Sequence, residues 1–323
     1  MFRAGVAGVG NLGKVHVGNL QKMTDRVQIV ALADPVPERR SGRNLRSDTL
    51  NIDLENDRAV TVGDVRSHAD YRDLCTDGEV DLVFIATPSD LHAPAAILAL
   101  EHGKHVFTEK PMALNATDCG RMIDAAKANG RTLMVGQVLR FWPAYREARR
   151  VIESGRYGKV LAATMRRHGT RPGGWFAEYA RSGGVKLDLL IHDVDAALWW
   201  WGEPDTLASR TSGRSDGVSA VYSQWQYANG LVVHLEALWD AGTPFVAEFR
   251  VVMEEATLEY SMNGGKGLCV TTGKGTEPVE IADPHGSAYE EETAYFIRCV
   301  LGDADGSQCP PEQSALAVKY ATL

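Results

Sequence analysis

Asp188 and His192 have side chains that could carry out acid–base chemistry, and they lie four residues apart. The apolar pattern around them predicts a helix over 187–201, and this spacing places both side chains on one helix face, one turn apart. Histidine changes charge near neutral pH, so it can take the proton of a hydroxyl group. The carboxylate can orient the imidazole or hold a neighbouring substrate hydroxyl. The alternative interpretation is a surface or helix-capping pair.

A second group of residues, near the N-terminus, could hold the phosphates of a dinucleotide. The segment Gly8-Val9-Gly10-Asn11-Leu12-Gly13 matches the pattern G-x-G-x-x-G. The first glycine permits a tight turn, the second lets the backbone approach a pyrophosphate, and the third lets a helix pack close to the sheet. The segment follows a predicted strand over 3–9 and opens a predicted helix over 11–23, whose N-terminus would face the phosphates. We therefore expect Gly8, Gly10, Asn11, Leu12 and Gly13 to bind the cofactor.

Asp34 follows the second predicted strand, over 27–33, where this fingerprint places an acidic residue for the adenosine ribose. A carboxylate there accepts hydrogen bonds from both ribose hydroxyls and repels a 2′-phosphate, which favours NAD over NADP. Two alternatives stay open: Asp34 is a turn residue before Pro35, or the nearby Arg39 and Arg40 hold a 2′-phosphate.

The composition is that of a globular protein with little attraction for nucleic acid or anionic membranes. The 323 residues carry a formal net charge of -8, with 44% hydrophobic and 24% charged residues. No run approaches the roughly 18 apolar residues of a membrane helix, and the N-terminus does not resemble a signal peptide. The five cysteines are scattered without a CxxC spacing, so neither a disulfide framework nor a zinc site is expected. These features predict a cytoplasmic protein.

The predicted elements divide the chain into two domains. Strands over 3–9, 27–33, 80–86, 105–108 and 132–135 alternate with helices over 11–23, 93–101 and 116–129. This rhythm predicts an α/β Rossmann-type domain with a parallel sheet over 1–138, in which 36–69 is polar and irregular. Strands over 160–167, 208–211, 218–227, 231–239, 246–253 and 257–260, with helices over 187–201 and 288–301, follow. We expect an α+β substrate-binding and oligomerisation domain over 139–323 with a large, mainly antiparallel open sheet.

Three further segments, together with the glycine fingerprint, make the chain resemble a known family. They are Ala86–His92 (ATPSDLH), Gly103–Pro111 (GKHVFTEKP) and Gly183–Asp195 (GGVKLDLLIHDVD). In this order they are similar to the motifs of the glucose–fructose oxidoreductase, inositol dehydrogenase and MocA-type (Gfo/Idh/MocA) family. The segment from Asp188 to Asp195 is most similar to that of inositol dehydrogenases.

The resemblance implies roles for individual residues. Lys110 resembles the family's active-site lysine, which stabilises negative charge on the reacting oxygen. The Lys110–Pro111 bond is expected to be cis, and the turn that contains it is expected to lie beside the nicotinamide. Lys110, Asp188 and His192 form the expected catalytic group, with His192 as the base, whereas a lysine before proline on its own is ordinarily a solvated loop residue. The cofactor site is extended by Thr87, Pro88, His92, Glu109 and Lys110.

No metal is expected, although Asp193 and Asp195 follow the pair, because no further His or Cys stands at ligand spacing. Substrate contacts are expected from Arg140, Arg171 and Trp175 as well as from the catalytic group. The alternatives are that Arg140 only ties the two domains together and that the Trp175 ring packs on the sheet.

The expected function is an NAD(P)-dependent oxidoreductase that transfers hydride between a sugar or polyol secondary alcohol and nicotinamide. Two alternatives stay open: an NAD-recycling enzyme that cleaves glycosides, and a non-catalytic dinucleotide-binding sensor. The open sheet face predicts a homodimer or homotetramer. Residues 314–323 begin a last helix, so either its final turns lie outside this sequence or the domain closes differently.

Overall fold

A computed structural model describes residues 1–43, 45, 61–214, 217–240, 242, 244–262, 267–281 and 287–323. Part of the segment predicted to be irregular, 44 and 46–60, therefore lies outside the described residues. The chain forms two compact units: Met1–Val138 with His285–Ala315, and Leu139–Pro284 with Leu316–Leu323. No helix in the described part of the chain is long and apolar enough to cross a membrane.

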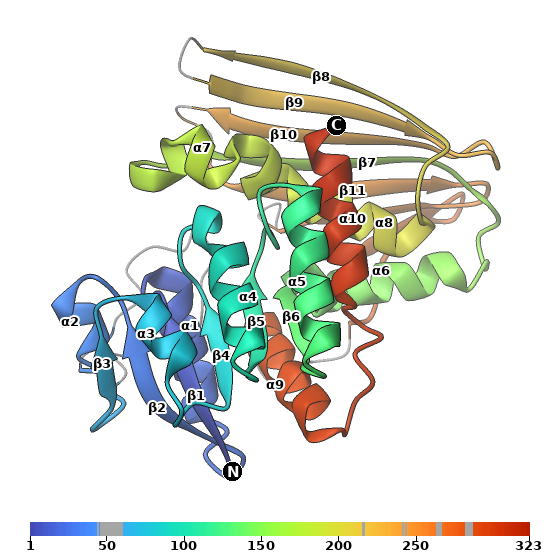
Figure 1. Cartoon of the computed structure of the whole chain (residues 1–323). Coiled ribbons are helices and arrows are strands. Elements are labelled where there is room, and N and C mark those ends of the chain that lie inside the picture. The colour runs from blue at the N-terminus through green and yellow to red at the C-terminus, as the bar shows by residue number, and fades with distance from the viewer. Residues whose placement is uncertain are drawn as a thin grey trace. The chain divides into compact units, whose positions relative to one another are not determined.

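The first unit contains a six-stranded parallel sheet with the order β3-β2-β1-β4-β5-β6 (Figure 1). Its strands are Phe2–Ala7 (β1), Val27–Ala33 (β2), Arg66–His68 (β3), Leu82–Ile85 (β4), His105–Glu109 (β5) and Leu133–Gly136 (β6). Central strands such as β4 are apolar throughout and fully buried, as expected where both sheet faces are covered. Ala7 pairs with Ala33 and with Ile85, so the chain leaves β1, β2 and β4 at one edge of the sheet. The predicted Rossmann-type sheet is confirmed.

The helices of this unit are Asn11–Gln21 (α1), Pro37–Arg40 (α2), Tyr71–Thr76 (α3), His92–Glu101 (α4), Ala116–Ala128 (α5) and Ala288–Leu301 (α9). Helix α9 corrects the expected division of the chain, which assigned 139–323 to the second domain. It packs on α1, where the Asn19 side chain donates hydrogen bonds to Tyr289 O at 3.0 Å and to Thr293 Oγ1 at 3.3 Å. A helix packs against any surface that complements its apolar face, and that surface can belong to a segment far away in the sequence. The position of α9 in the sequence therefore does not show which unit it packs on.

The second unit contains an eight-stranded sheet with the order β14-β13-β12-β11-β7-β10-β9-β8. Its strands are Val160–Thr170 (β7), Thr206–Arg214 (β8), Gly217–Gln226 (β9), Val232–Asp240 (β10), Val246–Met253 (β11), Thr257–Ser261 (β12), Cys269–Thr272 (β13) and Gly275–Pro278 (β14). Apart from β7 and β10, which run parallel, neighbouring strands are antiparallel, as predicted. The turn at Asn229 and Gly230 connects β9 to β10, and Gly230 has a φ of 91°, which favours glycine.

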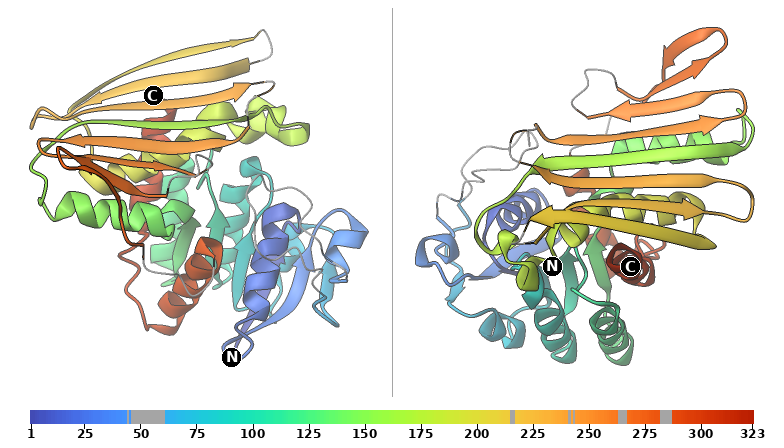
Figure 2. Two further views of the ribbon diagram at one scale, coloured as in Figure 1. Left: turned by 180° about the vertical axis from the view of Figure 1, so that it is seen from behind. Right: turned by 90° about the horizontal axis from the view of Figure 1, so that it is seen from above.

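Helices of the second unit cover one face of this sheet and leave the other open (Figure 2, right). They include Pro143–Glu153 (α6), Tyr179–Ser182 (α7) and Ile191–Trp201 (α8). Tyr145 and Trp200, from α6 and α8, contact each other and the ring of Phe249 on β11. On the open face, cross-strand ion pairs join Arg166 to Glu248 and Arg250 to Glu259. The last helix, Pro311–Thr322 (α10), runs from the residues of the first unit into those of the second.

Candidate functional site

The loop between β1 and α1 has the backbone shape that a dinucleotide needs. Gly8 has a φ of 84°, and a Cβ there would lie 2.5 Å from Ala86 O, while a Cβ at Gly13 would lie 1.9 Å from Gly8 O. A Cβ at Gly10 would meet no described atom within 4 Å, so this backbone is open to a ligand. The N-cap residue of α1 is Gly10, which has no side chain to cap the helix, and the first helical residues are Asn11 and Leu12. The helix start and the open backbone fit a pyrophosphate.

Asp34 lies at the end of β2 with its carboxylate held in place. Oδ2 accepts a hydrogen bond from Val9 N and Oδ1 accepts one from Val36 N, both at 2.9 Å. Each oxygen keeps a second lone pair that can accept from a ribose hydroxyl. Arg40 donates to the carbonyl oxygens of Asp34 and Pro35, both at 2.9 Å. The Asp34 contacts fit the ribose of NAD. Arg40, one of the two arginines considered for a 2′-phosphate, hydrogen-bonds to the main chain of the turn.

We expect Asp34→Ser to weaken the use of NAD and to improve the use of NADP, because it removes the ribose acceptor and the charge that repels a 2′-phosphate. The ratio of kcat/KM for NAD to that for NADP should fall at least about tenfold, the loss of one charged hydrogen-bonding partner. Steady-state rates with both dinucleotides measure this ratio. Glu38→Gln, which alters an exposed acid in α2, is the control. An unchanged ratio in the Asp34 variant would remove Asp34 from the ribose site.

His92 joins two turns at the same sheet edge. Its Nδ1 lies 2.7 Å from Pro111 O and its Nε2 lies 2.9 Å from Thr87 O. Burial lowers the pKa of the His92 imidazole. Both ring nitrogens face main-chain carbonyls, and the expected contact of His92 with the cofactor stays a prediction. The buried Thr87 hydroxyl, beside the half-buried Pro88, has no partner among the described residues, which suits a polar ligand at this edge.

Strand β5 ends at Glu109, the turn that follows contains Lys110 and Pro111, and the Lys110–Pro111 bond is cis, as expected. The Glu109 side chain is buried and points into the unit. Its Oε1 lies 2.7 Å from His16 Nε2, and its Oε2 accepts a hydrogen bond from Lys110 N at 3.2 Å. The Glu109 side chain thus contacts the scaffold, its expected cofactor contact stays a prediction, and Lys110 is half-buried.

Asp188 and His192 lie in one continuous helical segment, and both are half-buried. Lys186–Leu190 forms a π-helical turn that leads directly into α8, which the sequence pattern did not predict. π-Helical turns are rare in proteins, and those that occur are often found at functional sites. The segment starts after Gly183, which has a φ of 73°, and a Cβ there would lie 2.4 Å from Leu187. The glycine therefore allows the close approach that starts the helix.

Two buried arginine–aspartate pairs hold α8 in the second unit. Arg167 on β7 donates to Asp193 at 2.9 and 3.1 Å. Arg140 donates to Asp195 at 2.8 and 2.7 Å. Both aspartates thus bind guanidinium groups in bidentate pairs. Arg140 is fully buried, and its expected substrate contact stays a prediction.

The loop before α8 contains the remaining expected substrate residues. The Trp175 and Phe176 rings stack with centroids 3.9 Å apart, and both side chains are half-buried. Arg171 is also half-buried. Neither Trp175 nor Phe176 belongs to the core of the sheet, and the substrate roles of Arg171 and Trp175 stay predictions.

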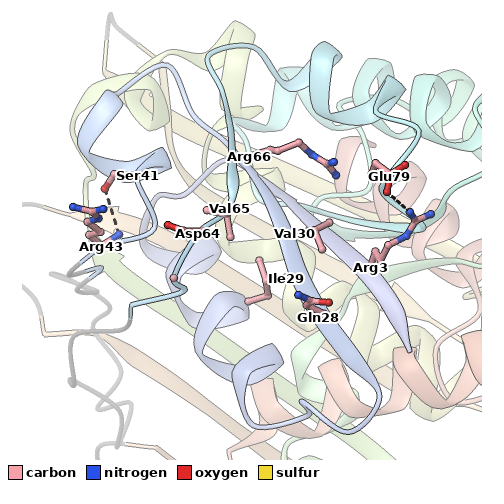
Figure 3. A pocket seen from close by; sticks show the side chains of 11 residues that line it. Arg3, Gln28, Ile29, Val30, Ser41, Arg43, Asp64, Val65, Arg66 and Glu79 are labelled. Carbon is pink, nitrogen blue, oxygen red and sulfur yellow. Dashed lines mark hydrogen bonds and ion pairs between the residues drawn. The ribbon is translucent and has the colours of Figure 1, made fainter.

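A surface pocket of the first unit lies at the end of the sheet where β1 and β3 begin (Figure 3). Its lining includes Arg3 from the start of β1, Gln28 and Ile29 from β2, and Arg66 from the start of β3. The glycine loop and Asp34 follow the opposite ends of the same strands. The pocket is therefore separate from the predicted cofactor site.

Comparisons with known proteins agree with these features. Residues 2–137 match the family described as "Oxidoreductase family, NAD-binding Rossmann fold". Residues 145–259 match the family described as "GFO/IDH/MocA C-terminal domain". The chain is 30% identical over 203 residues to inositol 2-dehydrogenase of Salmonella typhimurium and 33% identical over 205 residues to myo-inositol 2-dehydrogenase of Thermotoga maritima. Each alignment covers 62% of this chain and 55% of the relative, so the match spans about half the length of these relatives.

Solved structures share the fold over nearly the whole chain. Levoglucosan dehydrogenase in complex with NADH has a TM-score of 0.82 and 22% identity, covering 99% of this chain and 95% of that one. Aldose-aldose oxidoreductase from Caulobacter crescentus, complexed with glycerol, has a TM-score of 0.81 and 20% identity over the same shares. With both family matches in the expected order along one chain, residues 2–137 form an NAD-binding domain and the chain belongs to the Gfo/Idh/MocA oxidoreductase family.

Proposed function

We propose that this protein is an NAD-dependent oxidoreductase that acts on a secondary alcohol of a sugar or polyol. The observation that carries the proposal is the presence, in one chain, of a dinucleotide loop, a lysine in a cis-proline turn and an Asp/His pair on a braced helix. The names of the inositol dehydrogenase relatives support the substrate class. The second domain, from residue 139 onward and without α9, is the proposed substrate domain.

In the proposed mechanism His192 takes the hydroxyl proton onto its imidazole. Asp188, one helical turn earlier, orients that ring or holds an adjacent hydroxyl of the substrate. The Lys110 ammonium donates a hydrogen bond to the reacting oxygen and stabilises its developing negative charge. NAD, held by the glycine loop and Asp34, would supply the hydride acceptor for this oxidation. Arg171 and Trp175 are proposed to bind the other hydroxyls and a C–H face of the substrate.

The test is an absorbance assay of reduced nicotinamide, with NAD and NADP each supplied with a panel of inositols, aldoses and sugar acids. Substrate-dependent reduction of NAD is the expected result. Tight NAD binding with cleavage of a glycoside and no net NADH would replace this proposal with the cofactor-recycling reaction. Tight binding without any turnover would replace it with a sensor.

We also propose that the open sheet face of the second unit packs against another copy of the chain. Eight strands present this face, and exposed residues on it include Tyr222. Light scattering coupled to size exclusion should give a mass of at least twice 35.2 kDa. A single peak at the monomer mass would contradict the proposal. All five cysteines are free thiols, which supports a reducing compartment such as the cytoplasm.

A further inference from the structure

Three titratable side chains meet inside the first unit, and the proposed mechanism uses none of them. They are His16 of α1, Glu109 of β5 and Glu292 of α9. His16 and Glu292 are fully buried and Glu109 is 4% exposed. One nitrogen or oxygen atom from each lies within 4.8 Å of the others. His16 and Glu109 are in direct contact, with 2.7 Å between Nε2 and Oε1.

Aromatic rings form much of the wall around this cluster. The His16 ring contacts the rings of Phe84 and Phe107, with centroids 5.4 and 4.9 Å apart. Phe296, one turn after Glu292 on α9, contacts the same two phenylalanines. Apolar walls strengthen every electrostatic interaction inside them and penalise any charge that lacks a partner.

Glu292 is the member of the cluster with no partner. Neither of its carboxylate oxygens has a hydrogen-bond partner among the described residues. The titratable groups that face it are His16 from α1 and Glu109 from β5, and the Lys22–Glu290 ion pair lies at the exposed edge of the same two helices. Burial and the charge of Glu109 raise the pKa of Glu292 well above its usual value. A neutral carboxylic acid is therefore the form that fits this position.

We propose that Glu292 is a positioning residue: it keeps a proton in the core and, through Glu109, holds the main chain of Lys110 in the geometry that the reaction needs. The link to Lys110 is the hydrogen bond from its N–H to Glu109 Oε2 at 3.2 Å. One carboxylate oxygen of Glu292 lies within 4.8 Å of one of Glu109, a separation that a single bridging water would span. The inference rests on the proposed function only for the role of Lys110.

The first test is independent of turnover. The folded protein keeps a proton that the unfolded chain releases above about pH 4.3, so this group makes the folded state less stable as the pH rises from there toward its raised pKa. Glu292→Gln, which resembles the neutral acid, should remove that loss. The urea midpoint of the variant should exceed that of the original protein by an amount that grows from pH 5 to pH 8. Glu290→Gln, on the same helix, is the control and should leave the slope unchanged.

The second test asks whether the position matters for catalysis. Glu292→Leu should lower kcat by about tenfold with little change in the KM for substrate, because a small displacement of a catalytic group is costly. Glu292→Gln should restore most of the loss. The two tests can also separate the inference from the proposed function. If Glu292→Gln shows the expected pH-dependent stabilisation but neither the parent protein nor any variant turns over a substrate, Glu292 is protonated in the folded protein and the proposed function is wrong.

Two results would overturn the inference. One is a Glu292→Gln variant that is less stable than the parent at pH 8, which would mean that the ionised carboxylate stabilises the fold. The other is a stoichiometric divalent metal in the purified protein that is lost in Glu292→Gln, because the same three side chains could ligate a cation. Elemental analysis of the parent protein and of Glu292→Gln measures this metal content.

Discussion

Lys110→Met and His192→Asn are each expected to lower kcat by about a thousandfold, the usual contribution of a general base or of a charge-stabilising donor. Methionine keeps most of the length of lysine and removes its charge, and asparagine keeps a polar group that cannot take a proton. Affinity for NAD should stay within about twofold in His192→Asn, because this change touches none of the expected cofactor residues. Single-turnover rates with saturating substrate, together with fluorescence titration of NADH, measure the two quantities.

Lys127→Met is the matched control for the lysine change. Lys127 is an exposed residue of α5 that forms a surface ion pair with Glu312 at 2.9 Å. Its loss should leave kcat unchanged, since surface pairs contribute little. Turnover that persists in a Lys110→Met, His192→Asn double variant would remove both residues from the mechanism and would favour a different site on the same fold.

Breaking the buried ion pair between Arg167 and Asp193 is expected to produce the largest loss of stability. Their side chains are 4% and 0% exposed and lie 2.9 Å apart. Removing one partner leaves an uncompensated charge in the core, so Arg167→Met and Asp193→Leu should each lower the free energy of unfolding by about 3–5 kcal/mol. Urea unfolding measured by fluorescence reports this change, and activity should be lost at lower temperature because α8 carries His192.

The double variant distinguishes the interaction energy of the Arg167–Asp193 pair from the packing of the two side chains with their other neighbours. Arg167→Met with Asp193→Leu should be more stable than the sum of the two single losses predicts, because no charge is left without a partner. The exposed pair Arg150 and Glu147 on α6 is the control, and its loss should change stability by less than about 1 kcal/mol. Losses that simply add in the buried pair would show that the two charges do not interact.

Most of the first unit could be predicted from local pattern. Strand β2 has the predicted bounds, and β4, α4 and α5 differ from them by at most two residues at either end. These strands are apolar because both sheet faces are covered, and that requirement is visible in any single strand. Short elements such as β3, α3 and β14 were not predicted, since three to six residues show too little periodicity. Helix α6 was also missed, although Pro143 at its first turn is a recognisable start signal.

The cis Lys110–Pro111 bond was expected from the resemblance to a family, whereas the sequence by itself determined the fold class, the glycine loop, Asp34 and the spacing of Asp188 and His192. Each depends on neighbours within a few residues, so local chemistry is enough to define it. Only the tertiary structure decided that α9 packs on α1, that Arg140 binds Asp195, that His92 contacts two main-chain carbonyls, and that Glu109 lies beside His16 and Glu292. His16 and Glu292 are 276 residues apart in the sequence, and the contact between two such side chains depends on which helix faces pack together, which no local pattern records.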